Sequence, residues 1–272
     1  MKKLLALVAV FALMASTAYA GKVVVNGSTT VLPLMQLVDD HFKANSGLGV
    51  EISLSGGGSS NGAKALIDGT TDIAMMSRDM KGKEIDAAKA NGRTPLQHIV
   101  AYDCIVPVVK SSNPVSAITK EQLLKIYTGE ITNWKDLGGK DAEIVVISRD
   151  TSSGTYDCWK DKIMHSGAEK AKVFPGASLL ASNGAVAQAV AKNEQAIGYV
   201  GLAYLNAELK ALPVDGVSAS VETALNGSYP ISRGLNLYTA GAPTGDAKTV
   251  IDFIMSPAGQ KMAAEKGFIP IQ

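Results

Sequence analysis

The chain has 272 residues, and its 26 lysines and arginines nearly balance its 25 aspartates and glutamates, which gives a formal net charge of +1. This balance argues against a nucleic-acid or membrane-surface partner, because such partners usually select a basic face or stripe. Removing the first 20 of the 272 residues leaves 252, enough for one large domain or two smaller ones.

The N-terminus has the features of a secretory signal peptide. Lys2 and Lys3 precede an apolar run from Leu4 to Met14, and the sequence Ala18-Tyr19-Ala20 follows. The run is too short for a membrane-spanning helix of about 20 residues. We therefore expect cleavage after Ala20 and export to a periplasm. The mature chain then has no direct membrane insertion, and losing two lysines brings its net charge to −1.

Apolar β-branched runs alternate with amphipathic segments from residue 22 onward, which is typical of an α/β fold. Turn-rich stretches at 111–114 and 227–233 are the candidate crossings between two lobes, which makes the first lobe discontinuous. The patterns predict strands at 23–25, 50–54, 72–76, 98–109, 143–147, 196–200 and 234–238, and helices at 31–42, 63–67, 120–127, 156–165, 185–192 and 249–265.

Three of these strands are each followed by a loop rich in serine, threonine and glycine, and then by a helix. The loops are 26–30, 55–60 and 148–155. A helix start presents unpaired N–H groups and about half a positive charge, which suits an anion. One such loop is weak evidence, because the same residues are favoured helix caps. Three loops at the carboxyl edge of one open sheet favour an anion-binding cleft.

Charged residues accompany these loops. Arg149 lies in the third loop, and Arg78 follows the strand at 72–76. A guanidinium group binds oxyanions through paired N–H bonds, although Arg78 could instead form an ordinary surface pair with Asp79. Asp103 stands in an apolar run, where an unpaired carboxylate is costly to bury. We expect it to have a partner, either an arginine in a structural ion pair or, in addition, a proton of the ligand.

These motifs resemble those of the phosphate-binding subunits of bacterial phosphate ABC transporters. The similarity covers nearly all of the mature chain, down to residues 267–270. The motifs that carry it are Gly27-Ser28-Thr29-Thr30-Val31-x-Pro33, Gly56-Gly57-Gly58-Ser59-Ser60-Asn61-Gly62, Ser77-Arg78, Ala101-Tyr102-Asp103, the segment 127–134, Arg149 with Ser153-Gly154-Thr155, and the segment 196–200.

The resemblance implies a type II periplasmic binding protein, an α/β fold with two lobes, each a mainly parallel sheet flanked by helices. Residues 21–108 with 232–272 would form lobe 1, and 109–231 would form lobe 2. The ligand would lie in the interlobe cleft. It implies high-affinity capture of inorganic phosphate and delivery to the permease subunits of an ABC importer. No enzymatic activity, cofactor or metal is expected, and the protein would be a monomer.

By its motifs, the resemblance assigns phosphate binding to Ser28, Thr29, Thr30, Ser59, Ser77, Arg78, Asp103, Arg149, Ser153, Gly154 and Thr155. Phosphate retains at least one O–H near neutral pH and sulfate has none, so an acceptor carboxylate at Asp103 would favour phosphate. Long members of the family place an acidic residue two positions after the arginine, where this chain has Thr151. Asp103 or Asp150 could take over its role.

The two cysteines, Cys104 and Cys158, flank the expected cleft. Cys104 stands where many relatives have a small residue, and Cys158 falls in the helix after the third loop. An oxidising compartment permits pairing, so we hypothesise a Cys104–Cys158 disulfide that pins the start of the crossover to the second lobe. Two separately buried thiols are the alternative, since two residues cannot establish connectivity.

Other functions are less well supported by the residues. The segment 58–62 matches the G-x-S-x-G elbow of serine hydrolases with Ser60 as the nucleophile, but none of His41, His98 and His165 stands in a recognisable loop after a late strand. A metal-ligand cluster and a P-loop are absent from the sequence. The main rival is a binding protein for another tetrahedral oxyanion, such as sulfate or molybdate.

Overall fold

The computed structural model describes residues 22–167 and 170–271. The expected signal peptide and its cleavage site lie outside the described residues. Within them, no helix has the length and apolarity needed to cross a membrane.

The described chain alternates strands and helices, as the sequence patterns predict. The strands are β1 (Val23–Gly27), β2 (Ile52–Gly56), β3 (Ile73–Met76), β4 (Pro95–Lys110), β5 (Val145–Arg149), β6 (Ser178–Leu180), β7 (Ala196–Gly201), β8 (Leu209–Ala211) and β9 (Ser232–Ala240). The α-helices are α1 (Leu32–Ala44), α2 (Ser59–Asp68), α3 (Gly82–Ala90), α4 (Lys120–Thr128), α5 (Gly154–Trp159), α6 (Asn183–Lys192), α7 (Val221–Leu225), α8 (Gly245–Met255) and α9 (Pro257–Glu265). Short 3₁₀ turns cover Ser46–Leu48, Trp134–Leu137 and Leu202–Tyr204, and a π-helical turn, η3 (Lys160–Met164), follows α5.

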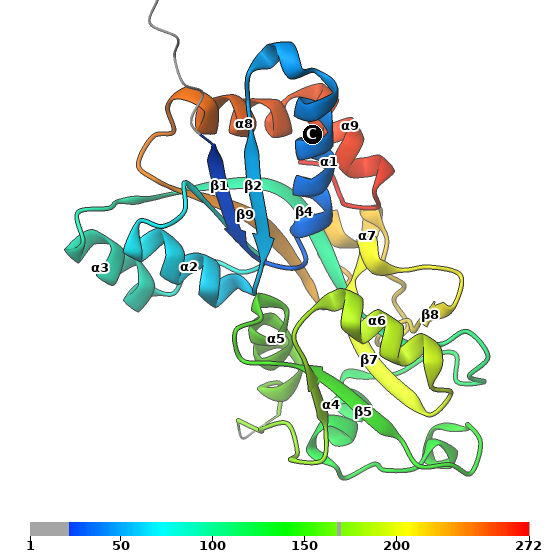
Figure 1. Cartoon of the computed structure of the whole chain (residues 1–272). Coiled ribbons are helices and arrows are strands. Elements are labelled where there is room, and N and C mark those ends of the chain that lie inside the picture. Colours follow the sequence, from blue (N-terminus) through cyan, green and yellow to red (C-terminus); the bar gives the residue numbers. More distant parts are fainter. Residues whose placement is uncertain (1–21, 168–169, 272) are drawn as a thin grey trace, which may run out of the picture.

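The long strand β4 joins the two ends of the molecule (Figure 1). Its first part, up to Cys104, pairs with β9, and its second part, from Ile105 onward, pairs with β7. The strand order is β2-β1-β3-β9-β4-β7-β5-β6, with β8 added at the end of β4. Figure 1 shows β1, β2 and β9 with α1, α8 and α9 in the upper part, and β5 and β7 with α4 to α6 in the lower part.

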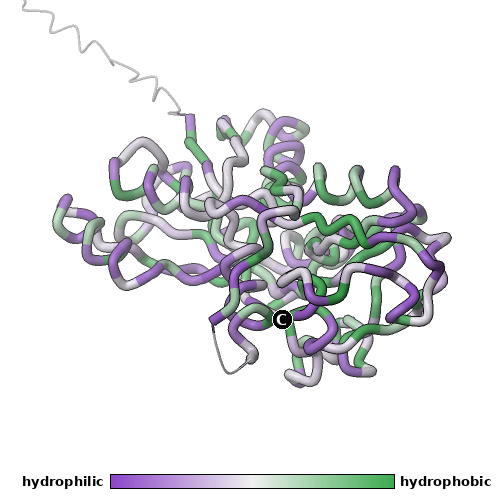
Figure 2. The backbone as a smooth tube through the Cα atoms, turned by 90° about the horizontal axis from the view of Figure 1, so that it is seen from below, coloured by the Kyte–Doolittle hydropathy of each residue, from purple (hydrophilic) through white to green (hydrophobic). Residues whose placement is uncertain are grey.

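The two larger hydrophobic cores correspond to these two parts, and a third, smaller cluster joins side chains of α2, β3 and β9. The first core joins side chains of β1, α1, β3, β9, α8 and α9, including Val25 and Ile254. The second core joins side chains of the end of β4, α4, β5, α6 and β7, including Tyr127 and Val200. In Figure 2, apolar segments run through the interior and hydrophilic ones gather toward the periphery. We call the parts built on these cores the first body and the second body.

Both sheets are mixed, so the prediction of mainly parallel sheets is wrong. β1 pairs in parallel with β2 and β3, but β9 is antiparallel to both β3 and β4. The physical reason is the discontinuous path of the chain. It leaves the first body through β4 and returns through β9, which therefore runs back between β3 and β4. In the second body, β4 is likewise antiparallel to β7, whereas β5 is parallel to β6 and β7.

The helix predicted at 249–265 is two helices. α8 ends at Met255 and α9 begins at Pro257, with the Ser256 side chain capping α9 by accepting from the Gly259 N–H. A proline is favoured at the first helical position because its missing N–H needs no partner there. The segment 156–165 is likewise divided, since α5 changes into the π-helical turn at Lys160. α3, α7 and the short strands β6 and β8 were not predicted.

Candidate functional site

Four helix starts converge where the two bodies meet. The tip of β2 points toward α5 in Figure 1, and the starts of α1 and α6 contribute to the same region through Thr30 and Asn183. The Ser60 N–H donates to the Ser152 carbonyl, which joins the start of α2 to the loop before α5. Such helix starts present N–H groups toward the space between the bodies.

Two glycines allow this close approach. Gly58 has a φ of 98°, and a Cβ atom there would lie 2.5 Å from Ser152 Oγ. A Cβ atom on Gly154, at the start of α5, would lie 2.2 Å from Ser59 Oγ and 2.8 Å from Ser77 Oγ. All three distances are well below van der Waals contact. Any other residue would therefore push the two bodies apart.

Buried hydroxyl groups line the junction. Thr30 Oγ1 lies 2.8 Å from Thr155 Oγ1, and Ser59 Oγ lies 3.3 Å from Ser77 Oγ. Ser28 Oγ accepts from the Thr30 N–H at 3.1 Å. The hydroxyl-bearing residues among those predicted are all buried: Ser28, Thr29, Thr30, Ser59, Ser77, Ser153 and Thr155. The structure thus brings the residues of all three predicted loops to one place.

Arg149 is a buried cation at this junction. Its side chain is held by backbone carbonyls, with Nε donating to Leu180 at 2.9 Å and Nη2 to Ala181 at 2.9 Å. Nη2 also lies 3.3 Å from Thr29 Oγ1, which comes from the first body. Nη1 is buried and has no hydrogen-bond partner among the described residues. Burial lowers the pKa of Arg149, because removal from water disfavours the charged form.

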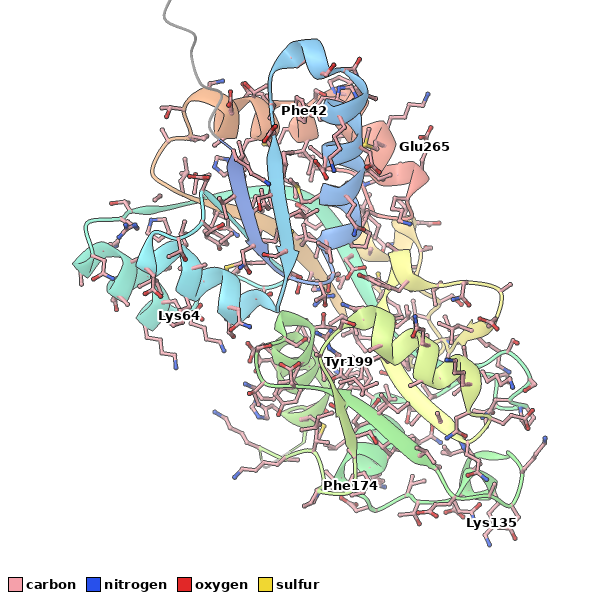
Figure 3. The ribbon with its side chains drawn as sticks, viewed as in Figure 1. Phe42, Lys64, Lys135, Phe174, Tyr199 and Glu265 are labelled. Atoms are coloured by element: carbon pink, nitrogen blue, oxygen red, sulfur yellow. The ribbon has the colours of Figure 1, made fainter. Side chains whose placement is uncertain are left out.

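The expected acidic clamp on Arg149 is not formed by Asp103 or Asp150. Asp150 Oδ1 instead accepts from the backbone N–H and the hydroxyl of Ser152, at 2.8 and 2.5 Å. Tyr199 contacts the backbone next to the Arg149 side chain. Its hydroxyl accepts from the Arg149 backbone N–H at 3.2 Å and lies 2.9 Å from Ser148 Oγ. Figure 3 shows Tyr199 in the second body, near its junction with the first.

Asp103 is paired with Arg233. Arg233 Nε and Nη2 both donate to Asp103 Oδ2, at 3.1 and 2.7 Å, and the Leu202 N–H donates to Oδ1 at 3.0 Å. Arg233 also donates to the Ser77 carbonyl and to Thr30 Oγ1, at 3.1 and 3.3 Å. The predicted arginine partner of Asp103 therefore exists. Complete burial nevertheless raises the pKa of Asp103, and the nearby guanidinium only partly offsets that effect.

Among the described residues at the junction, Arg149 is a buried cation that no carboxylate pairs with. Arg149 and Arg233 are 1 % and 9 % exposed, and Asp103 is fully buried. Arg233 is paired with Asp103, whereas Arg149 is held by two backbone carbonyls and the Thr29 hydroxyl. An uncompensated buried charge is unfavourable, so this site favours a bound anion. Hydroxyl groups and helix starts supply the donors that an oxyanion requires.

Comparisons with known proteins agree on one family. A family model described as a PBP superfamily domain matches residues 14–258. The phosphate-binding protein PstS of Borreliella burgdorferi is 32 % identical over 257 residues, which cover 91 % of this chain and 89 % of the relative. The chain belongs to the PstS family of phosphate-binding proteins.

Two further relatives extend this result. PstS of Bacillus subtilis is 33 % identical over 254 residues, covering 93 % of this chain and 81 % of the relative. A crystal structure from Clostridium perfringens is described as a phosphate ABC transporter substrate-binding protein with bound phosphate. It is 37 % identical, covers 93 % of this chain and all of its own, and has a TM-score of 0.84.

The contacts of Arg78 argue against the phosphate-binding role that the family motif predicts. Its Nε donates to Asp157 and its two terminal nitrogens donate to Glu84, each at 2.8 Å. The remaining two N–H groups bond to the Asp79 carbonyl and to Ser60 Oγ. A guanidinium group has five N–H donors, and all five are used within the protein. Arg78 therefore belongs to an ion-pair cluster beside the candidate site.

The structure also contradicts the hypothesised disulfide. Both Cys104 and Cys158 are free thiols. Cys104 belongs to the second core, at the point where β4 leaves β9, and Cys158 lies on α5 at the edge of that core. Burial raises the pKa of Cys104 to about 12 and also raises that of Cys158. Two separate thiols, the alternative to pairing, are what the structure contains.

Sequence reasoning missed Arg233 and Asn183. Asn183 Nδ2 donates to Thr29 Oγ1 and Thr30 Oγ1 at 3.2 and 3.0 Å, and its Oδ1 accepts from the Gly201 N–H. Ser182-Asn183-Gly184 follows β6 and opens α6, so it repeats the predicted strand, loop and helix pattern. β6 is only three residues long, which hid that signal. Arg233 precedes a predicted strand and had no local motif to mark it.

The serine-hydrolase alternative finds no support in the geometry. Ser60 Oγ accepts from Arg78 Nη2 at 3.1 Å. The three histidines have other neighbours: His41 stacks on Phe253, His98 lies 3.1 Å from Thr239 Oγ1, and His165 faces Asp161. Among the described residues, no group of three or more histidine, cysteine or acidic side chains could hold a metal ion.

Proposed function

We propose that this protein captures inorganic phosphate outside the cytoplasm and delivers it to the permease subunits of an ABC-type importer. It acts as a binding component of a transporter and not as an enzyme. The single observation that carries the proposal is Arg149, a buried guanidinium among hydroxyl groups whose Nη1 has no hydrogen-bond partner in the described part of the chain. The PstS relatives and the phosphate complex from Clostridium perfringens identify the anion class.

The proposed binding site contains ten of the eleven predicted residues and replaces Arg78 by Arg233. Arg149 neutralises the anion, and the hydroxyl groups and helix-start N–H groups donate to its oxygens. Asn183 orients the Thr29 and Thr30 hydroxyl groups through its side-chain bonds. The proposed ligands are Ser28, Thr29, Thr30, Ser59, Ser77, Asp103, Arg149, Ser153, Gly154, Thr155 and Arg233.

Binding is proposed to couple to closure of two lobes, residues 21–108 with 232–272 and residues 109–231. The separate cores and the change of partner along β4 support two lobes, and they place the first crossing between Cys104 and Ile105 rather than after residue 108. The chain crosses between the bodies within β4 and just before β9, and such single-strand crossings permit hinge motion. Secretion by a signal peptide cleaved after Ala20, into a periplasm, remains part of the proposal.

Phosphate is favoured over sulfate by Asp103. A carboxylate fixed by Arg233 and the Leu202 N–H can accept the proton of hydrogen phosphate and meets only lone pairs on sulfate. Calorimetry with phosphate, arsenate and sulfate tests the proposal. We expect one phosphate per protein with micromolar or tighter affinity, similar binding of arsenate, and sulfate at least 100-fold weaker. Absence of phosphate binding, or equal affinity for sulfate, would contradict it.

A further inference from the structure

Asp157 forms a charged cluster that bridges the two bodies, away from the proposed ligand contacts. Its Oδ2 atom accepts from Arg78 Nε at 2.8 Å and lies 2.8 Å from Lys81 Nζ. Its Oδ1 accepts from Lys160 Nζ at 3.3 Å. Asp157 and Lys160 belong to the second body, through α5 and the turn after it. Arg78 and Lys81 belong to the first body, between β3 and α3.

The first-body side of this cluster is rigid without Asp157. Both carboxylate oxygens of Glu84 accept from Arg78, at 2.8 Å each. Glu84 also accepts from the Lys81 N–H at 2.8 Å, which fixes the start of α3. A guanidinium group that donates to both oxygens of one carboxylate is held in one defined geometry. Arg78 therefore presents its Nε edge to Asp157 already oriented, and little side-chain entropy is lost when the two bodies meet.

The bridge is shielded from solvent, which decides its strength. The Arg78 and Asp157 side chains are only 8 % and 7 % exposed. Exposed ion pairs contribute about 0 to 1 kcal/mol, whereas breaking a buried pair leaves a desolvated charge and costs more. Asp157 keeps only Lys160 on its own body, so separation of the bodies removes two of its three cationic partners. Its contacts therefore distinguish a closed from an open arrangement.

The cluster lies beside the proposed site but is distinct from it. A pocket of about 390 Å³ extends between the bodies, lined by Arg78, Lys81, Asp157 and Arg233 among others. Arg233 contacts Thr30 and Asp103 of the site, whereas Arg78 has every N–H engaged by protein groups. Asp157 is one helical turn after Gly154, at the same helix start that faces the ligand site.

We infer that Asp157 is an electrostatic latch, a positioning residue that holds the Arg78–Lys81 face of the first body and slows opening of the cleft. The inference rests on the proposed closure around phosphate. A contact made only in the closed arrangement lowers the free energy of that arrangement and raises ligand affinity without touching the ligand. The latch acts mainly on the dissociation rate, because phosphate leaves only after the bodies separate.

The test replaces Asp157 by asparagine and measures phosphate dissociation by stopped-flow displacement. We expect dissociation at least tenfold faster and a weaker affinity by a similar factor. Asp161→Asn is the matched control, because it removes the same charge from the same pocket and its neighbour His165 lies on the same body. The control should dissociate at the wild-type rate.

The direction of the effect separates the latch from simple electrostatics. If Asp157 only occupied Arg78 and repelled anions, Asp157→Asn would bind phosphate more tightly. Unchanged or slower dissociation in that variant therefore overturns the latch. If Asp157→Asn does not fold, Lys81→Met is the second variant, because it removes a half-exposed partner of Asp157. We expect phosphate to dissociate from it about threefold faster. An unchanged dissociation rate would contradict the latch.

A measurement without phosphate separates failure of the latch from failure of the proposed function. Small-angle scattering of ligand-free protein reports the separation of the bodies. We expect a larger radius of gyration for Asp157→Asn than for Asp161→Asn. If the wild-type protein does not bind phosphate, the proposed function fails, and equal radii for the two variants would then also reject the latch.

Discussion

The hydroxyl group of Thr30 lies 2.8 Å from that of Thr155, 125 residues further along the chain. Thr30 precedes α1 of the first body, and Thr155 lies in the first turn of α5 in the second. The contact joins two of the three predicted anion loops. Gly154, which precedes Thr155, lies so close to the first body that a Cβ atom there would be 2.2 Å from Ser59 Oγ.

Gly154→Ala tests whether this approach is required for binding. The added methyl group would lie 2.2 Å from Ser59 Oγ, so we expect the bodies to remain apart and phosphate affinity to fall at least tenfold. Calorimetry measures the loss. Gly184→Ala is the matched control, because its nearest heavy atom would be 3.8 Å away. Equal affinities for the two variants would show that closure does not need the contact.

Asp103→Asn tests the source of anion selectivity. An amide can turn its NH₂ group toward sulfate, whereas the carboxylate offers only acceptors. We expect the variant to lose phosphate affinity and gain sulfate affinity, so that the ratio of the two dissociation constants falls at least tenfold. Competition calorimetry measures that ratio. Retention of the wild-type ratio would assign selectivity to other residues.

The burial of Asp103 also predicts that the free energy of unfolding depends on pH. Burial raises the pKa of Asp103 above its ordinary value, so the folded state holds this proton more tightly than the unfolded chain does. The contribution of Asp103 is therefore most favourable at low pH and declines as the pH rises through the folded-state pKa.

Asp103→Asn should consequently become more stable relative to wild type as the pH rises from about 4 to 7 in phosphate-free buffer. Urea unfolding at a series of pH values measures this difference in free energy. If the wild type instead became more stable relative to the variant as the pH rises, the ion pair with Arg233 would outweigh the cost of burying the Asp103 carboxylate.

Both thiols should react with an alkylating reagent without prior reduction of the protein. Cys104 is buried with a pKa of about 12, so its thiolate is scarce at neutral pH and alkylation of the folded protein is slow. We expect mass spectrometry to find two alkyl groups after denaturation without a reductant. In the folded protein, partly exposed Cys158 should react first. A mass without added alkyl groups would indicate a disulfide.

Local patterns predicted the parts of the site that follow strands directly. The loops at 26–30, 55–60 and 148–155 each combine a strand end with a helix start, and this short-range chemistry is visible in sequence. The break at Ser256-Pro257 was also readable, because a serine cap before proline marks a helix start. The apolar spacing continues on both sides of this break, and this spacing predicted a single helix over 249–265.

Long-range partners could not be predicted in the same way. Asp103 pairs with Arg233 130 residues away, and Arg78 pairs with Asp157 79 residues away. A buried Asp103 required a partner on physical grounds, but several arginines and lysines could supply it. Only the return of β9 beside β4 selects Arg233, and only the meeting of α5 with the chain after β3 selects Asp157.

Phosphate binding by Arg149→Met shows whether the buried guanidinium holds the anion, because methionine keeps an unbranched side chain and removes the buried charge. We expect calorimetry to show at least a 100-fold loss of phosphate affinity, while the ligand-free variant unfolds at the wild-type temperature or above, since an unpaired buried cation destabilises the empty site. Retained phosphate affinity in a folded Arg149→Met variant would show that this guanidinium does not hold phosphate.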